Sequence, residues 1–237
     1  MLEIALGAGG YARMGADGWF LVAPARAPFG PLTLAVAGLG RVRAEPGWPI
    51  RLAGDVLEIG PHRIRLAGVQ EARSCSVTAL GGTLAPPAGP PPATLLSGVR
   101  ALATGDVVRA VALLAGRGEG LTPVGDDVLA GFAGWMAAAG APVPMSRLAR
   151  DRSPPISLAY LRCAERGELP VAAVRLVDAL AAGDRAAAAR RARVLRRWGG
   201  SSGRGLIWGF AAAVQLRSSG AASASSNASL APSPICV

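Results

Sequence analysis

Hydrophobic positions follow two different patterns along the chain, and the change falls near residue 85. Before it, apolar stretches are short and are separated by Gly and Pro at close intervals, as in GWFLVAP, LTLAVAG, DVLEIG and RIRLAG. Short apolar runs bounded by turn-forming residues are typical of β-strands. We therefore predict that residues 1–84 form a β-rich N-terminal region, as a small barrel or a sandwich.

A proline-rich segment separates the two patterns. Residues 85–93 read APPAGPPPA. Proline lacks the backbone N–H that a helix interior or a central strand requires, and it favours extended backbone. The segment is therefore predicted to be a connector between two domains.

After the connector, apolar residues recur three or four positions apart, which indicates amphipathic helices. Residues 94–115 predict two short helices, with a break near Thr104 and Gly105. We predict an α+β protein in which residues 94–217 form a mainly α-helical C-terminal domain. Residues 218–237 are rich in Ser and Ala and carry no charge, so we predict a disordered tail. The remaining helices are expected over residues 127–139, 157–167, 169–182, 184–198 and 204–217.

The longest apolar run does not predict a membrane span. It extends from Val128 to Val143, contains Gly and Pro, and is shorter than the roughly 18 to 20 residues that a span needs. The N-terminus has an acidic residue, Glu3, where a secretory signal carries basic ones. We expect a cytoplasmic protein without a membrane partner.

The content of Lys, Cys and His restricts the kinds of catalytic and metal site that the chain can form. All basic residues are Arg, and the absence of Lys excludes a lysine Schiff base and the phosphate-binding lysine of a P-loop. Cys75, Cys163 and Cys236 lie far apart and lack paired metal-ligand spacing, so we expect reduced thiols. His62, the single histidine, is expected to be partly exposed on a strand and excludes a multi-histidine metal site within one chain. We predict no cofactor.

Residues 118–132 read GEGLTPVGDDVLAGF and place two carboxylates, Asp126 and Asp127, between a Gly-rich turn and an apolar helix. Such a pair costs free energy unless cations or hydrogen-bond donors meet it. The helix dipole stabilises a carboxylate in the first turn by about 0.3–1 kcal/mol, so capping alone explains only one of them. Gly131 and Gly134 allow another helix to approach closely. We therefore expect the carboxylates at the edge of a core.

Two more polar turns precede predicted helices. WGGSSGRG places Ser201 and Ser202 where hydroxyls and amides can bind an anion or a carbonyl oxygen, with an ordinary Ser cap as the alternative. RSPPIS places Ser153 and Ser157 at another helix start, which alone indicates a plain N-cap.

Carboxylate acceptors at one turn and hydroxyl donors at another suit a small substrate that has NH₂ groups and an anionic end. We expect the turns near residues 126 and 201 to face one pocket. Binding of a Mg²⁺ ion by Asp126 and Asp127 remains an alternative, although two carboxylates are too few to specify a metal site. The predicted catalytic residues are Asp126, Asp127 and Ser202. The predicted substrate-binding residues are Gly120, Thr122, Gly125, Ser157, Gly200, Ser201 and Gly203.

These turns also carry a resemblance. GLTPVGDD, SPPISLAYLRCAERGEL and GGSSG occur in this order between Gly116 and Val214. In motif and order they resemble domain-of-unknown-function family 2877, which includes the AllH-type subunit of oxamate carbamoyltransferase. The resemblance implies a role beside companion subunits in purine-nitrogen catabolism, as in allantoin degradation. There, oxalurate and phosphate are interconverted with oxamate and carbamoyl phosphate, without a redox cofactor.

The departures from the family's motifs keep a second function open. Val124 stands where a small polar residue is usual, Ser153 and Pro154 where two threonines are common, and Gly200 where a histidine is frequent. A non-catalytic scaffold or regulatory subunit is therefore the main alternative to an enzyme subunit.

Nucleic-acid binding is the less favoured alternative. Residues 184–200 are rich in Arg, and a formal net charge of +10 attracts phosphate backbones. However, Val194, Leu195 and Trp198 give the helix an apolar side, as in a surface helix. Few aromatic residues interleave with the basic ones, so base stacking is poorly supported and we expect no nucleic-acid partner.

Overall fold

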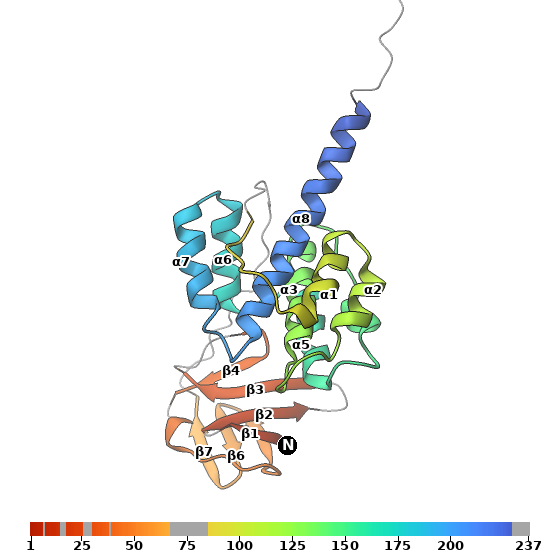
Figure 1. The fold of residues 1–237 in the computed structure, drawn as a ribbon. Helices are drawn as coiled ribbons and strands as arrows, with labels where there is room; N and C mark the ends of the chain where they lie inside the picture. Colours follow the sequence, from red (N-terminus) through yellow and green to blue (C-terminus); the bar gives the residue numbers. More distant parts are fainter. Residues whose placement is uncertain (7, 15–17, 26–29, 38, 67–84, 229–237) are drawn as a thin grey trace, which may run out of the picture.

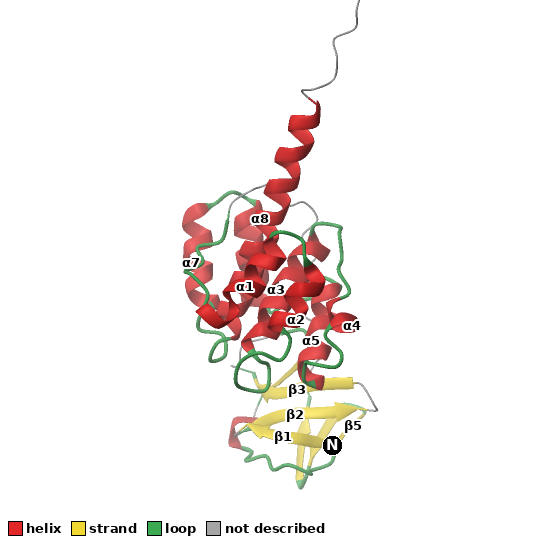
Figure 2. Ribbon diagram, turned by 45° about the vertical axis from the view of Figure 1, so that its right-hand side comes forward, coloured by secondary structure: helices red, strands yellow, loops and turns green. Residues whose placement is uncertain are grey.

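In the computed structural model, the chain is described except for residues 7, 15–17, 26–29, 38, 67–84 and 229–237. The strands gather at one end of the molecule and the helices at the other (Figures 1 and 2). The predicted α+β class is confirmed, because the described part of the chain has seven strands followed by eight α-helices. Cys75 and Cys236 lie outside the described residues, and Cys163 is a buried free thiol.

The N-terminal region consists of two small open sheets, so the predicted alternative of a closed barrel is wrong. The first has the order β1-β2-β3-β4, with β3 and β4 parallel and the other pairs antiparallel, and the second is the antiparallel meander β5-β6-β7. Buried side chains such as Val22, Val36 and Leu57 form a core of their own here. The strands are β1 (Leu2–Leu6), β2 (Gly9–Met14), β3 (Gly18–Pro24), β4 (Thr33–Val36), β5 (Ile50–Ala53), β6 (Val56–Ile59) and β7 (His62–Arg65).

His62 lies on β7 and is partly exposed, as predicted, with its ring centroid 5.5 Å from that of Trp48. Residues 85–92 form neither helix nor strand. The division into domains at this connector stays a prediction.

The helical region confirms the predicted helices and adds the short α4. The expected break falls between α1 and α2, where Gly105 has a φ of 82° and the Asp106 carboxylate accepts a hydrogen bond from the Arg109 amide. None of the described helices combines the length and apolar character that crossing a membrane requires. The helices are α1 (Ala93–Ala103), α2 (Val107–Leu114), α3 (Val124–Ala138), α4 (Met145–Leu148), α5 (Pro155–Glu165), α6 (Val171–Ala181), α7 (Arg185–Leu195) and α8 (Ser202–Ala228).

Helices α3 and α8 pack along each other in the middle of the helical region (Figure 1). Gly131 of α3 faces the Leu206 backbone, where a Cβ would lie 2.3 Å from the carbonyl oxygen. The Trp135 and Phe210 rings meet across the same contact, with centroids 6.0 Å apart. Gly131 lets another helix approach closely, as predicted, whereas Gly134 faces the Leu169 side chain.

Helix α8 continues past Arg217 to Ala228, so residues 218–228 of the predicted tail are helical in the structure. Ala has the highest helix propensity, and this segment extends a helix that is already nucleated and anchored against α3. Residues 229–237, the rest of the predicted tail, lie outside the described residues.

Candidate functional site

A cavity of about 420 Å³ opens where the first turns of α3 and α8 meet α5 and the first sheet. The turns near residues 126 and 201 both line it, as the sequence suggested. The Thr122 and Ser202 hydroxyl oxygens, 80 residues apart in the chain, lie 3.3 Å from each other. The predicted site residues that line the cavity are Gly120, Thr122, Asp127, Gly200, Ser201 and Ser202.

Asp127 supplies the cavity with a carboxyl group in an unusual environment. Its Oδ2 atom is buried and has no hydrogen-bond partner. The pKa of Asp127 is raised to about 8, mainly by burial; the nearby Asp126 carboxylate contributes to the rise, and hydrogen bonds with Ser202 and Thr122 oppose it. Burial therefore outweighs the N-terminal helix dipole, which favours the charged form.

Asp126 has a different position. It is only 2% exposed and is not among the residues that line the cavity. Its Oδ1 atom accepts hydrogen bonds from the Gly116 amide at 2.8 Å and from the Ser153 hydroxyl at 2.6 Å. The carboxylate thus fixes the Gly-rich turn and the start of α5 against α3.

Three other predicted binding residues are packed away from the cavity. A Cβ at Gly125 would lie 2.0 Å from the Leu114 carbonyl oxygen, and one at Gly203 would lie 1.7 Å from that of Leu195. Ser157 is 1% exposed, and its hydroxyl has no partner among the described residues. The two glycines therefore allow close packing of backbone segments next to the site.

No cluster of three or more His, Cys, Asp and Glu side chains suited to a metal ion occurs among the described residues. A Mg²⁺ ion at the two aspartates would therefore rely on Asp126 and Asp127, and Asp126 Oδ1 already accepts two hydrogen bonds.

Residues 114–214 match the family model described as oxamate carbamoyltransferase subunit AllH. The match covers less than half of the chain and shows similarity to the AllH family over this segment. The match confirms the resemblance and contains the three polar turns together with α3 and α5. No curated protein and no solved structure matches the chain.

Sequence reasoning missed the part of the cavity that lies outside the AllH match. Tyr11 on β2 and Leu21 on β3 line the cavity from the first sheet. Tyr160 of α5 faces Tyr11, with their hydroxyl oxygens 3.3 Å apart. The chain contains only two tyrosines and both line the site, but no motif in the sequence marks them.

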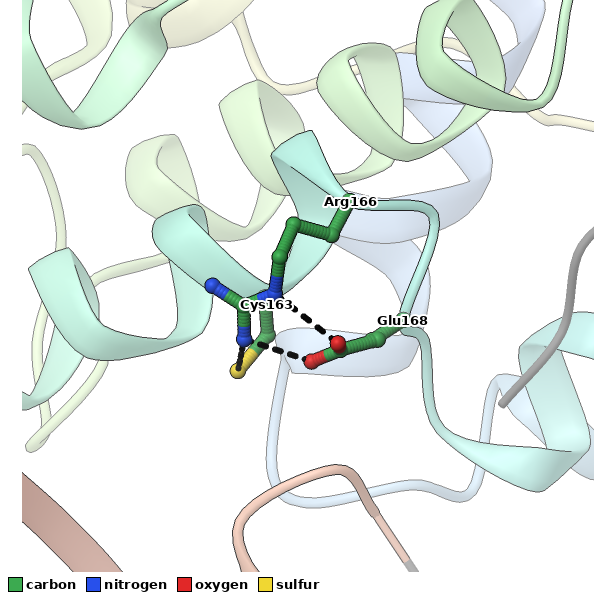
Figure 3. A network of polar contacts seen from close by, with 3 residues as sticks. All are labelled: Cys163, Arg166 and Glu168. Carbon is green, nitrogen blue, oxygen red and sulfur yellow. Dashed lines mark hydrogen bonds and ion pairs between the residues drawn. The ribbon is translucent and has the colours of Figure 1, made fainter. Parts of the chain in front are cut away.

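Glu168 is a second carboxylate that the motifs did not reveal. It lines the cavity just after α5, and both of its oxygens accept hydrogen bonds from the Arg166 guanidinium, at 2.8 and 2.7 Å (Figure 3). Arg166 lowers the pKa of Glu168. The same guanidinium contacts Cys163 Sγ at 3.5 Å, but burial raises the pKa of that thiol to about 11. Cys163 therefore stays a neutral thiol rather than a nucleophile.

The raised pKa of Asp127 predicts that stability falls as pH rises. Its carboxyl is neutral in the folded chain up to about pH 8 but ionises near pH 4 when unfolded. The contribution of the neutral Asp127 carboxyl to the stability of the fold is thus complete below about pH 4, and it is lost between about pH 4 and pH 8. We expect the free energy of unfolding to decrease by about 2 kcal/mol between pH 5 and pH 8, allowing for screening by water in the cavity. Urea unfolding at a series of pH values measures this decrease in the free energy of unfolding.

Asp127→Asn should remove this decrease, whereas Asp151→Asn at an exposed position should retain it. The chain has one histidine, so few other groups change charge in this range. Equal pH dependence in the wild type and in Asp127→Asn would contradict the assignment.

Proposed function

We propose that this protein acts as the AllH-type subunit of a carbamoyltransferase and that its cavity binds the carbamoyl or ureido end of a small substrate. Oxalurate, oxamate and carbamoyl phosphate are the substrates this proposal implies, in purine-nitrogen catabolism. The family match over residues 114–214 supports the subunit assignment, and a subunit implies companion carbamoyltransferase subunits. The convergence of Asp127, Glu168 and the Ser201–Ser202 turn on one cavity supports the substrate class.

The two carboxyl groups in the cavity suit a group that contains both a carbonyl oxygen and NH₂. Glu168 is held ionised by Arg166, so it accepts hydrogen bonds from the substrate nitrogen. Asp127 has a pKa of about 8 and is largely neutral at pH 7, so it donates a proton or a hydrogen bond to a substrate oxygen. Two carboxyl groups whose environments separate their pKa values in this way are typical of acid–base sites.

The negative charge at the anionic end of the substrate must be stabilised by other groups. No arginine is among the described residues that line the cavity, and the sequence contains no lysine. Helix α8 begins at Ser202, and the amides of Gly203 and Arg204 already donate to the carbonyl oxygens of Trp198 and Ser201. The hydroxyls of Ser201 and Ser202, together with the helix dipole, favour an anion at this end of the helix. These donors can also stabilise negative charge that develops on the carbonyl oxygen during transfer.

The arrangement divides the predicted catalytic residues into two roles. Asp127 and Ser202 line the cavity and are the groups that contact substrate in this proposal. Asp126 lies behind them and acts as a positioning residue through Gly116 and Ser153. Positioning of this kind matters because transfer requires the reacting groups to be held in a productive geometry.

Calorimetry with oxalurate, oxamate and carbamoyl phosphate tests the proposal, on the chain alone and with its companion subunits. We expect saturable heat for at least one ligand, with a dissociation constant between about 1 μM and 1 mM, the usual range of Michaelis constants. Ser202→Ala should weaken binding, and Ser146→Ala, which alters a hydroxyl outside the cavity, should leave it unchanged. Absence of heat with all three ligands under both conditions would instead favour a scaffold subunit.

A further inference from the structure

Two tyrosines, Tyr11 and Tyr160, form one side of the cavity. Tyr11 reaches the cavity from β2, and Tyr160 reaches it from α5, so the two halves of the chain meet at this pair. Their hydroxyl oxygens lie 3.3 Å apart, within hydrogen-bonding distance. Both side chains are partly buried and both line the cavity, so the pair is available to a ligand.

The hydroxyl pair retains one proton for a ligand. Burial raises the pKa of both Tyr11 and Tyr160, and the Asp127 carboxylate adds to the increase in each case. Both hydroxyls are therefore protonated at physiological pH. Because each tyrosine has a single O–H donor, one proton is used in the bond between the two hydroxyls and the other can be donated elsewhere.

We propose that Tyr11 and Tyr160 form an oxygen-binding wall, in which one hydroxyl donates to the other and the second donates to the carbonyl oxygen of a bound carbamoyl or ureido group. This inference rests on the proposed function. It divides recognition of a planar O=C–NH₂ group between two sides of the cavity. The tyrosine hydroxyls, with neutral Asp127, meet the oxygen, and Glu168 meets the nitrogen.

The proposal also makes the N-terminal sheets part of the site. Tyr11 lies outside residues 114–214, the segment that matches the AllH family. The position of Tyr11 depends on its neighbour Gly10, where a Cβ would lie 2.0 Å from the Ile4 carbonyl oxygen. The glycine therefore lets β2 approach β1 closely beside the tyrosine.

The chain offers a direct spectroscopic test, because it contains only two tyrosines. Labelling tyrosine with ¹³C at Cζ should give two ring signals, both from the cavity. Titration with oxalurate, and separately with carbamoyl phosphate, should shift both signals with the midpoint measured by calorimetry. The experiment uses the full chain, with companion subunits present where calorimetry requires them.

Two variants separate ligand binding from a purely structural link. Tyr11→Phe and Tyr160→Phe each remove one hydroxyl and keep the ring, and each should weaken binding about 10-fold, as expected for a lost hydrogen bond. Ser146→Ala removes a hydroxyl that bonds Glu165 outside the cavity and should leave the affinity unchanged. Thermal melting followed by circular dichroism shows whether each variant is folded.

The outcomes distinguish this inference from the proposed function. Ligand heat without movement of the tyrosine signals, or with unchanged affinity in both Phe variants, would overturn the tyrosine wall and leave the proposed function standing. A lower melting temperature with unchanged affinity would mean that the tyrosine pair only stabilises the fold. This result would also contradict the proposed binding role of the tyrosines. No heat and no signal shift with any ligand, with companions present, would overturn both.

Discussion

Asp127→Asn is expected to abolish phosphate-dependent carbamoyl transfer in a complex reconstituted with companion subunits, while the chain remains folded. The substitution keeps the shape of the side chain but removes the group that can give up a proton. The Oδ2 atom of Asp127 is buried and has no hydrogen-bond partner. The adjacent Asp126 does not line the cavity, so it does not replace the lost acid. Loss of a general acid typically lowers the rate about 10²- to 10⁴-fold. Steady-state turnover of oxalurate with phosphate measures the effect.

Two controls show whether the loss is specific to the cavity. Asp151→Asn changes an exposed carboxylate and should retain full turnover. Asp126→Asn should act mainly through stability, because Asp126 anchors Gly116 and Ser153 behind the cavity. If Asp127→Asn turns over substrate at the wild-type rate, Asp127 is not a catalytic residue.

Local sequence signals predicted the helical half of the site well. Gly-rich and Ser-rich turns before apolar runs are short-range features, and they placed the starts of α3 and α8 within two or three residues. The sequence also indicated that the turns near residues 126 and 201 meet at one pocket. It could not separate the roles of Asp126 and Asp127. Adjacent helix residues point about 100° apart, so which one faces the cavity depends on how the helix is packed.

The sheet side of the site was beyond prediction from local pattern. Tyr11 reaches Tyr160 across 149 residues of sequence, and no periodicity encodes that contact. Strand β2 begins with Gly9 and Gly10, which in a sequence indicate a turn. In the structure they lie where Cβ atoms would meet the backbones of the neighbouring strands. Tertiary packing therefore decides the role of these glycines.

Gly209→Ala should destabilise the protein more than an ordinary core substitution. A Cβ at this position would lie 2.2 Å from the Val128 carbonyl oxygen and 2.5 Å from the Phe132 amide nitrogen, both in α3. These are backbone atoms that cannot rotate away, so α8 must move from α3. Overpacking typically costs about 1–3 kcal/mol, and we expect at least about 3 kcal/mol here. Denaturant unfolding measures the loss.

The direction of this effect is informative because helix propensity predicts the opposite one. Ala stabilises an open helix position by about 1 kcal/mol relative to Gly. Gly200→Ala is a suitable control for stability, since a Cβ there would meet nothing within 4 Å. Separation of the helices would also move Ser202 away from Asp127, so residual folded Gly209→Ala should bind ligand more weakly. An unfolding free energy equal to or above that of the wild type would mean that α3 and α8 do not pack this closely, and the cavity between their first turns would lose its structural basis.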